Sequence, residues 1–202
     1  MKVLELFAGS RSFSKVAEEI GMKTFTSDYK EFDSINYVVD FIDFDIKKLP
    51  FKPDIIWASP PCTSYSIAGI RHHRIDKDTP FSDFAFKSDK MMIKLLQLIK
   101  ELNPKYYFIE NPRGLLRKMS FMQNLEIRNT VTYCQYGDTR MKPTDIWTNS
   151  ANWKPKKMCK NGMPCHEAAP RGSKTGTQGL KGNYLRSIVP YELCKEILES
   201  CI

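Results

Sequence analysis

The sequence predicts an α/β fold with a mostly parallel sheet that ends in an antiparallel hairpin. Short apolar runs alternate with helical patterns along much of the chain, which is typical of strand–helix–strand units. The first apolar run ends in a glycine turn and is followed by a helix, as in nucleotide-binding α/β domains. Two extended runs in the second half flank the turn 135–143, which indicates a strand pair.

Composition predicts one globular domain over residues 1–202, because this length is enough to bury one core. The chain has 31 Lys and Arg against 23 Asp and Glu, and its net charge of +8 favours a polyanionic partner. There is no apolar stretch of membrane-spanning length and no signal-peptide pattern. We therefore expect a cytoplasmic protein with no membrane partner, whose six cysteines are reduced.

The first strand–turn–helix unit is a candidate ligand site. Lys2–Phe7 is predicted as a strand and 11–20 as a helix, and Gly9 between them lets the backbone approach a ligand. The next strand, 23–27, ends at Asp28, about 20 residues after the glycine turn, where such folds place a carboxylate that binds ribose hydroxyls. Without that turn, Asp28 would be equally well explained as a strand-end turn residue.

The strand 54–57 ends in Pro60-Pro61, which delivers Cys62 to the edge of the sheet where ligands bind. Cys62 is the candidate nucleophile, and helix-start N–H groups after it are expected to lower its pKa. The alternative is a buried structural cysteine.

Residues 37–40 are predicted as the strand before 54–57. Asp45 follows it and is either a ligand carboxylate or a solvated acid.

The strand that follows the Cys62 region supplies a candidate acid. Before that strand, residues 71–74 are expected to form a basic loop that touches substrate or solvent, and residues 88–102 a core helix. The strand 106–109 ends at Glu110, which we expect to face Cys62 across one cleft.

After the strand pair 125–134 and 144–148, residues 149–183 are predicted as an irregular basic loop and 190–202 as a closing helix. The loop holds Cys159, Cys165 and His166, with Cys134 as the nearest further ligand. These residues form part of a zinc site or are unrelated surface thiols.

Three motifs occur in a familiar order: Leu4–Gly9, Ser59–Ser66 and Phe108–Pro112. With Tyr133–Gly137 and Ser187–Pro190, the chain resembles the DNA (cytosine-5) methyltransferases, as a compact member without their large target-recognition region. The resemblance implies a Rossmann-like S-adenosylmethionine-dependent methyltransferase fold.

The same resemblance implies a chemistry for Cys62 and Glu110. The thiolate adds to the 6-carbon of cytosine while the acid assists at ring N3, so that the 5-carbon takes a methyl group from S-adenosylmethionine. The implied cofactor contacts are Phe7, Ala8, Gly9, Ser10, Asp28, Asp45 and Pro60. The implied substrate contacts are Ser66, Asn111, Arg113, Arg140 and Lys142.

The chain departs from the family pattern at Ser10-Arg11-Ser12, where further glycines are usual, and in residues 149–183, which replace the target-recognition region. Arg11 is therefore a candidate contact for the carboxylate end of the cofactor. DNA is the expected partner, as single strand or with a flipped cytosine. Either specificity is relaxed, or a partner protein supplies it, or the substrate is smaller than duplex DNA. Such a compact enzyme suits a phage or a restriction–modification system.

Two alternatives stay open: an amino-methyltransferase acting at cytosine N4 or adenine N6, which Ser59-Pro60-Pro61 also fits, and an inactive nucleic-acid-binding module. The oligomeric state and the target sequence are left open.

Overall fold

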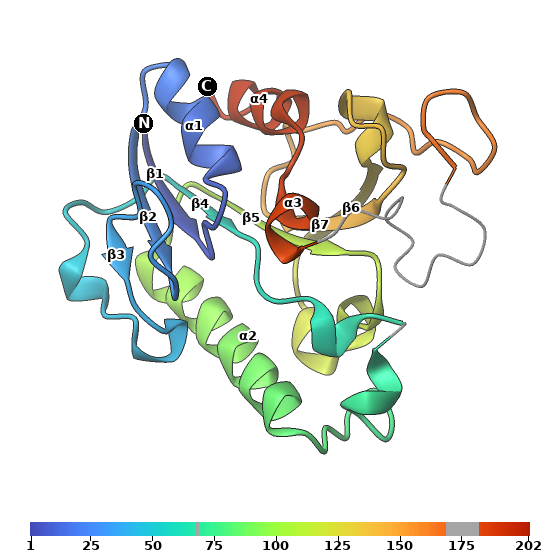
Figure 1. Cartoon of the computed structure of the whole chain (residues 1–202). Coiled ribbons are helices and arrows are strands. Elements are labelled where there is room, and N and C mark those ends of the chain that lie inside the picture. The colour runs from blue at the N-terminus through green and yellow to red at the C-terminus, as the bar shows by residue number, and fades with distance from the viewer. Residues whose placement is uncertain (68, 169–181) are drawn as a thin grey trace.

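A computed structural model describes residues 1–67, 69–168 and 182–202. Its centre is a seven-stranded sheet in the order β3-β2-β1-β4-β5-β7-β6 (Figure 1). The strands are β1 (Lys2–Leu6), β2 (Lys23–Asp28), β3 (Tyr37–Val38), β4 (Ile55–Ala58), β5 (Tyr106–Pro112), β6 (Ile127–Thr132) and β7 (Pro143–Thr148). Neighbouring strands in the series β3, β2, β1, β4 and β5 pair in parallel, whereas β7 runs antiparallel to both β5 and β6. The predicted fold class is confirmed.

Helices cover both faces of the sheet (Figure 1). One face packs against α1 (Ser12–Glu19) and α4 (Tyr191–Glu199), and the other against α2 (Asp83–Leu102). Successive residues of a strand point to opposite faces, so Val3 joins the α1/α4 core while Leu4 joins the α2 core. Burial on both faces explains why these strands are continuous apolar runs.

The helix α2 begins earlier than the predicted 88–102. Ser82 caps its N-terminus, because the Ser82 hydroxyl accepts a 3.2 Å hydrogen bond from the Ala85 N–H. Phe84 and Phe86 in the first turn are exposed, so the regular apolar spacing starts further along the chain than the first residue of the helix. The helix ends at Leu102, and Asn103 directly after it takes a left-handed conformation.

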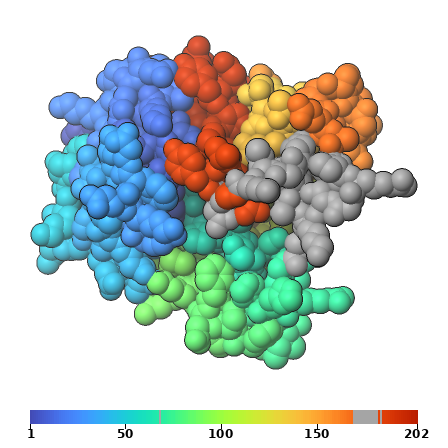
Figure 2. Space-filling view, in the orientation of Figure 1, coloured from blue at the N-terminus to red at the C-terminus, as the bar shows by residue number. Residues whose placement is uncertain are grey.

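The C-terminal part contains a short helix that the sequence pattern did not predict, α3 (Asn183–Ser187), ahead of α4. Its Tyr184 ring lies 5.9 Å from the Phe32 ring, and the Val189 N–H after it donates to the Ser12 hydroxyl at 3.2 Å. Orange-red atoms of this segment lie beside the blue N-terminal elements in Figure 2. The C-terminal segment therefore packs against the N-terminal strand–turn–helix unit.

Residues 149–168 contain neither helix nor strand, as the predicted irregular loop 149–183 requires, and the part from 169 to 181 lies outside the described residues. Among the described residues, none of the helices is both long and apolar enough to cross a lipid bilayer.

Candidate active site

Cys62 lies on a loop that leaves the buried strand β4 and continues into the short 3-10 helix Thr63–Tyr65. Contacts from β5 hold this loop. The Asn111 side-chain amide donates a 2.9 Å hydrogen bond to the Pro60 carbonyl. A Cβ on Gly114 would lie 2.5 Å from the backbone oxygen of Tyr65, so any side chain there would force the two loops apart.

Helix α2 braces the same loop from the other side. The buried Arg74 guanidinium pairs with Asp89 on α2 and donates a 3.1 Å hydrogen bond to the Ser64 carbonyl. The Tyr65 hydroxyl donates to the same Asp89 carboxylate at 2.7 Å. The expectation that residues 71–74 contact substrate or solvent is therefore wrong for Arg74, which is buried and paired with Asp89.

Glu110 is buried near the end of β5, where β4 and β5 run in parallel with Ala58 opposite Ile109. Glu110 therefore lies one residue beyond the last β4 pair, at the edge where the Cys62 loop begins. The Tyr133 hydroxyl donates a 2.8 Å hydrogen bond to Glu110 Oε1, and Lys142 Nζ lies 3.8 Å from the same oxygen. Burial and the Glu110 charge raise the pKa of the Tyr133 hydroxyl well above its ordinary value, so it stays a donor.

The charge of Glu110 acts on the Cys62 thiol. Burial raises the pKa of the Cys62 thiol above its ordinary value, and the negative charge of Glu110 raises it further. The positive charges of Lys142 and Arg186 act in the opposite direction. The expected lowering of the Cys62 pKa by helix-start N–H groups is therefore wrong, because the helix after it is a three-residue 3-10 turn and burial dominates.

The glycine turn brings together the predicted cofactor residues of the N-terminal unit. Asp28 Oδ2 accepts a 2.9 Å hydrogen bond from the Gly9 N–H, and Oδ1 accepts one of 3.0 Å from the Lys30 N–H. Gly9 has a positive φ of 42°, which a side chain would strain. The Phe7 ring lies 4.6 Å from the Phe41 ring and offers an aromatic surface.

Ala8 and Ser10 belong to this turn as well. The Ala8 N–H donates to the Ser27 carbonyl at 3.0 Å, and the Ser10 hydroxyl lies 2.6 Å from the Ser12 hydroxyl. Arg11, which precedes α1, extends along that helix to pair with Glu18 near its C-terminal end.

Asp45 is not brought to this turn. Its carboxylate caps the short 3-10 helix Ile46–Lys48 by accepting a 2.9 Å hydrogen bond from the Lys47 N–H. It lines a shallow groove with Gln97 and Glu101 of the last turns of α2, which end at the opposite edge of the sheet from Cys62. We therefore leave Asp45 out of the candidate site.

Several predicted substrate contacts hold the protein together instead. Arg140 is buried, pairs with Asp138 and donates to the carbonyls of Leu185, Arg186 and Ile188 at the end of α3. Lys142 also donates to the Arg186 carbonyl at 3.1 Å. The donors of Arg140 are thus used within the chain, and its role as a substrate contact stays a prediction. Lys142 remains beside Glu110.

Ser66 and Arg113 stay beside the two loops. Ser66 ends the 3-10 turn after Cys62 and is half-buried. Arg113 is exposed just beyond β5, where its N–H donates to the Pro143 carbonyl at 2.9 Å.

Two buried polar residues that hold the site together were not singled out by sequence reasoning. Glu5 is buried in β1 and accepts hydrogen bonds from the N–H groups of Phe13 and Ser14, at 3.3 and 2.7 Å, which fixes α1 to the sheet. Its only signal was a carboxylate within an apolar strand. Tyr133 stands in the Tyr133–Gly137 motif, but the pattern assigned it no role.

The predicted metal ligands Cys159, Cys165 and His166 converge with Cys134 in the described structure, and their ligand atoms all lie within 4.8 Å of one another.

A family model of the C-5 cytosine-specific DNA methylases matches residues 1–139. The chain belongs to this family. The matched region carries both Cys62 and Glu110, as well as the glycine turn and Asp28. Arg140, Lys142 and three of the four clustered metal ligands lie beyond it.

Three relatives illustrate the range of the C-5 cytosine-specific DNA methylase family. The chain is 29% identical to a probable DNA (cytosine-5)-methyltransferase of frog virus 3 (isolate Goorha), and the alignment covers all of both proteins. It is 32% identical to the type II methyltransferase M.HpaII of Haemophilus parainfluenzae, over 55% of this chain and 31% of that protein. It is 27% identical to the orphan methyltransferase M.SPRI of Bacillus phage SPR, over 57% of this chain and 27% of that protein. The chain thus spans less than a third of the last two.

Among solved structures, a methyltransferase of Entamoeba histolytica, EhMeth, has a similar fold with a TM-score of 0.56 and 17% sequence identity. The similarity covers 77% of this chain and 55% of that one.

Proposed function

We propose that this chain, as a single methyltransferase domain over residues 1–202, transfers a methyl group from S-adenosylmethionine to the 5-carbon of cytosine in DNA. The observation that carries the proposal is the position of Glu110, next to the Cys62 loop and held there by the Tyr133 hydroxyl. A nucleophile and an acid at one sheet edge are what attack on the pyrimidine ring requires, and nitrogen methylation has no use for this pair.

The proton states of Cys62 and Glu110 are coupled. Because the Glu110 charge raises the pKa of the thiol, a protonated Glu110 makes the thiolate easier to form. Protonated acid and thiolate are the combination that addition to cytosine needs. Lys142, 3.8 Å from Glu110 Oε1, favours the thiolate by its positive charge.

The proposed reaction begins when Cys62 Sγ forms a bond to the 6-carbon while a proton passes from Glu110 to ring N3. The 5-carbon of the resulting enamine would then take the methyl group as the bond between that methyl and the sulfonium sulfur of the donor breaks, which leaves S-adenosylhomocysteine. Loss of the 5-carbon proton to solvent, return of the N3 proton to Glu110 and release of Cys62 Sγ as the thiolate then restore the aromatic ring.

The glycine turn fits the methyl donor, which supplies the transferred group when bound. Each Asp28 oxygen accepts one backbone N–H, and a carboxylate oxygen has a second lone pair, so ribose hydroxyls find acceptors there. Phe7, which precedes the glycine turn and packs against Phe41, offers an aromatic face. Asp28 and Phe7 would therefore hold the nucleoside part of the donor.

DNA is the proposed substrate because the segment after β7 carries four exposed lysines: Lys154, Lys156, Lys157 and Lys160. Such cations bind phosphates without reading sequence. A base inside a duplex must be flipped out at a cost of a few kcal/mol, which phosphate contacts would offset. Sequence choice is therefore relaxed or supplied by a partner protein.

A trapping assay tests the proposal. The protein is incubated with labelled S-adenosylmethionine and DNA that contains 5-fluorocytosine, whose 5-fluorine cannot leave as a proton does. We expect a covalent adduct that survives denaturation and is lost in Cys62→Ser. Methyl transfer without an adduct would point to nitrogen methylation, and donor-independent DNA binding alone to an inactive module; either result overturns the proposal.

A further inference from the structure

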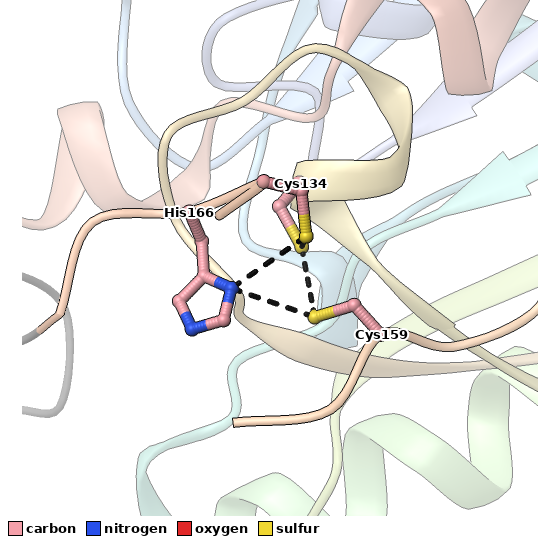
Figure 3. Close-up of side chains that lie close together, drawn as sticks. Cys134, Cys159 and His166 are labelled. Carbon is pink, nitrogen blue, oxygen red and sulfur yellow. Dashed lines mark hydrogen bonds between the residues drawn. The ribbon is translucent and has the colours of Figure 1, made fainter. Parts of the chain in front are cut away.

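Four side chains outside the Cys62 site meet at one point. Cys134 lies in the 3-10 turn Tyr133–Tyr136 directly after β6. Cys159, Cys165 and His166 come from the irregular segment after β7, and Figure 3 shows Cys159 and His166 directed toward Cys134. Two structural units distant in sequence thus contribute three sulfurs and one imidazole to a single centre.

The spacing of the ligand atoms suits a tetrahedral metal. Cys134 Sγ lies 3.2 Å from Cys159 Sγ and 3.8 Å from Cys165 Sγ. His166 Nδ1 lies 3.6 Å from Cys159 Sγ and 3.7 Å from Cys165 Sγ. With zinc–sulfur bonds of about 2.3 Å and zinc–nitrogen bonds of about 2.0 Å, tetrahedral geometry requires roughly 3.8 Å between sulfurs and roughly 3.5 Å from sulfur to nitrogen.

Simpler explanations leave part of the cluster unexplained. A disulfide has a sulfur–sulfur distance of about 2.05 Å, and a Cys134–Cys159 bond would give Cys165 and His166 no reason to converge. Buried apolar packing accounts for Cys194 and Cys201, which lie within the α1/α4 core. The clustered cysteines differ, because Cys159 and Cys165 are half-exposed and yet their sulfurs lie within 4.8 Å of each other.

We propose that Cys134, Cys159, Cys165 and His166 bind one zinc ion in a closed structural site. Three thiolates around one Zn²⁺ leave a net charge of −1, and the exposed Lys157 and Lys160 flank Cys159 in the chain with the opposite sign. The Gln135 side-chain amide donates to Cys165 Sγ at 3.3 Å, which orients this ligand from outside the metal centre.

The ion would fasten the later part of a segment that contains no helix or strand between residues 149 and 168. Its earlier part is held by the buried Trp153 ring and by the Cys159 N–H, which donates to the Thr132 hydroxyl at 2.9 Å, whereas Cys165 and His166 follow these anchors. Cys134 directly follows Tyr133, the residue that binds Glu110. The metal therefore links the lysine-bearing segment to the turn that positions the acid of the proposed reaction.

Metal content tests the site independently of catalysis. The full chain, purified without chelator, is expected to contain one zinc per molecule by elemental mass spectrometry. Exchange for Co²⁺ is expected to give the visible bands and the sulfur-to-cobalt charge-transfer absorption of tetrahedral thiolate coordination. Cys159→Ser and His166→Ala are expected to lose the metal, whereas the matched variants Cys62→Ser and His72→Ala keep it.

Because ligand variants can misfold, the wild-type protein supplies a second measurement. Removal of zinc by a chelator is expected to lower the Tm, and one equivalent of Zn²⁺, but not Mg²⁺, to restore it. A folded protein that takes up neither Zn²⁺ nor Co²⁺, or one that carries a Cys134–Cys159 disulfide after purification under reducing conditions, overturns the site. A metal-loaded protein without methylation would instead refute the proposed function alone.

Discussion

The Tyr133 hydroxyl donates a 2.8 Å hydrogen bond to Glu110 Oε1 in the interior of the protein, although 23 positions separate the two residues in the chain. This contact crosses from the turn after β6 to β5, with β7 between these strands in the sheet. The contact holds the Glu110 side chain at the end of β5, where its charge acts on Cys62.

Loss of this hydrogen bond should reduce catalysis without unfolding the protein. In Tyr133→Phe the buried ring is kept, while a hydrogen bond to a charged group, worth about 1.5–3 kcal/mol, is removed. We expect kcat/KM for DNA methylation to fall about 10- to 100-fold. Tyr106→Phe, at the start of the strand β5 that carries Glu110, is the matched control and should leave the rate near the wild-type value. Equal rates for both variants would show that Tyr133 does not position Glu110.

The pH dependence of Cys62 alkylation should report the charge of Glu110. Since that charge raises the pKa of the thiol, the midpoint of iodoacetamide labelling at Cys62, followed by peptide mass spectrometry, is expected to lie above pH 9.0. Glu110→Gln should move the midpoint to lower pH and speed labelling at neutral pH. Lys142→Met should move it to higher pH.

Methylation is expected to respond in the opposite way to labelling. Glu110→Gln removes the acid and should lower kcat by about 10²- to 10⁴-fold. Glu101→Gln, an exposed change at the end of α2, serves as the control for both measurements. A Glu110→Gln protein with an unchanged labelling midpoint would mean that Cys62 and Glu110 do not share one site.

The buried Glu5 should make folding stability depend on pH. Burial raises the pKa of Glu5 from its ordinary value of 4.5 to about 7, against the lowering effect of the hydrogen bonds from Ser14 and Phe13. Between these values the unfolded chain loses its proton while the folded chain keeps it, so the free energy of unfolding falls as pH rises. The difference between the two values corresponds to roughly 3 kcal/mol.

Urea denaturation at pH 5 and pH 8 measures this effect. The decrease in the free energy of unfolding is expected in the wild type and in Glu101→Gln, and should be largely absent from Glu5→Gln. A decrease of the same size in all three proteins would assign the pH dependence to other groups.

Gly114→Ala should disturb the Cys62 loop. The φ of Gly114 is −161°, which any residue adopts, so the backbone conformation is not the obstacle. The added Cβ would instead lie 2.5 Å from the Tyr65 oxygen. Overpacking of this kind costs about 1–3 kcal/mol, and we expect a lower Tm together with reduced adduct formation on 5-fluorocytosine DNA. Gly69→Ala, whose Cβ would lie 3.1 Å from the Thr63 oxygen, should have a smaller effect. Wild-type behaviour of Gly114→Ala would mean that the contact between the two loops is loose.

Local signals were enough to predict much of this protein. Apolar runs and a glycine turn predict the parallel strands and the meeting of Gly9 with Asp28, because the ends of neighbouring parallel strands share one edge of the sheet. The same rule placed Cys62 and Glu110 at that edge, after β4 and at the end of β5. These features depend on residues close together in sequence and on strand direction.

Only the tertiary structure decided what the charged residues do. The sequence predicts Arg140 as a substrate contact and the 71–74 loop as touching substrate or solvent. In the fold, Arg74 pairs with Asp89 on α2, and Arg140 donates to the carbonyls at the end of α3. Asp45 follows a strand and yet lies beside the far end of α2. Cys134 joins residues 159–166 only because the turn after β6 and the segment after β7 pack together. Burial and pairing are set by contacts between residues that are distant in sequence, and no local pattern encodes them.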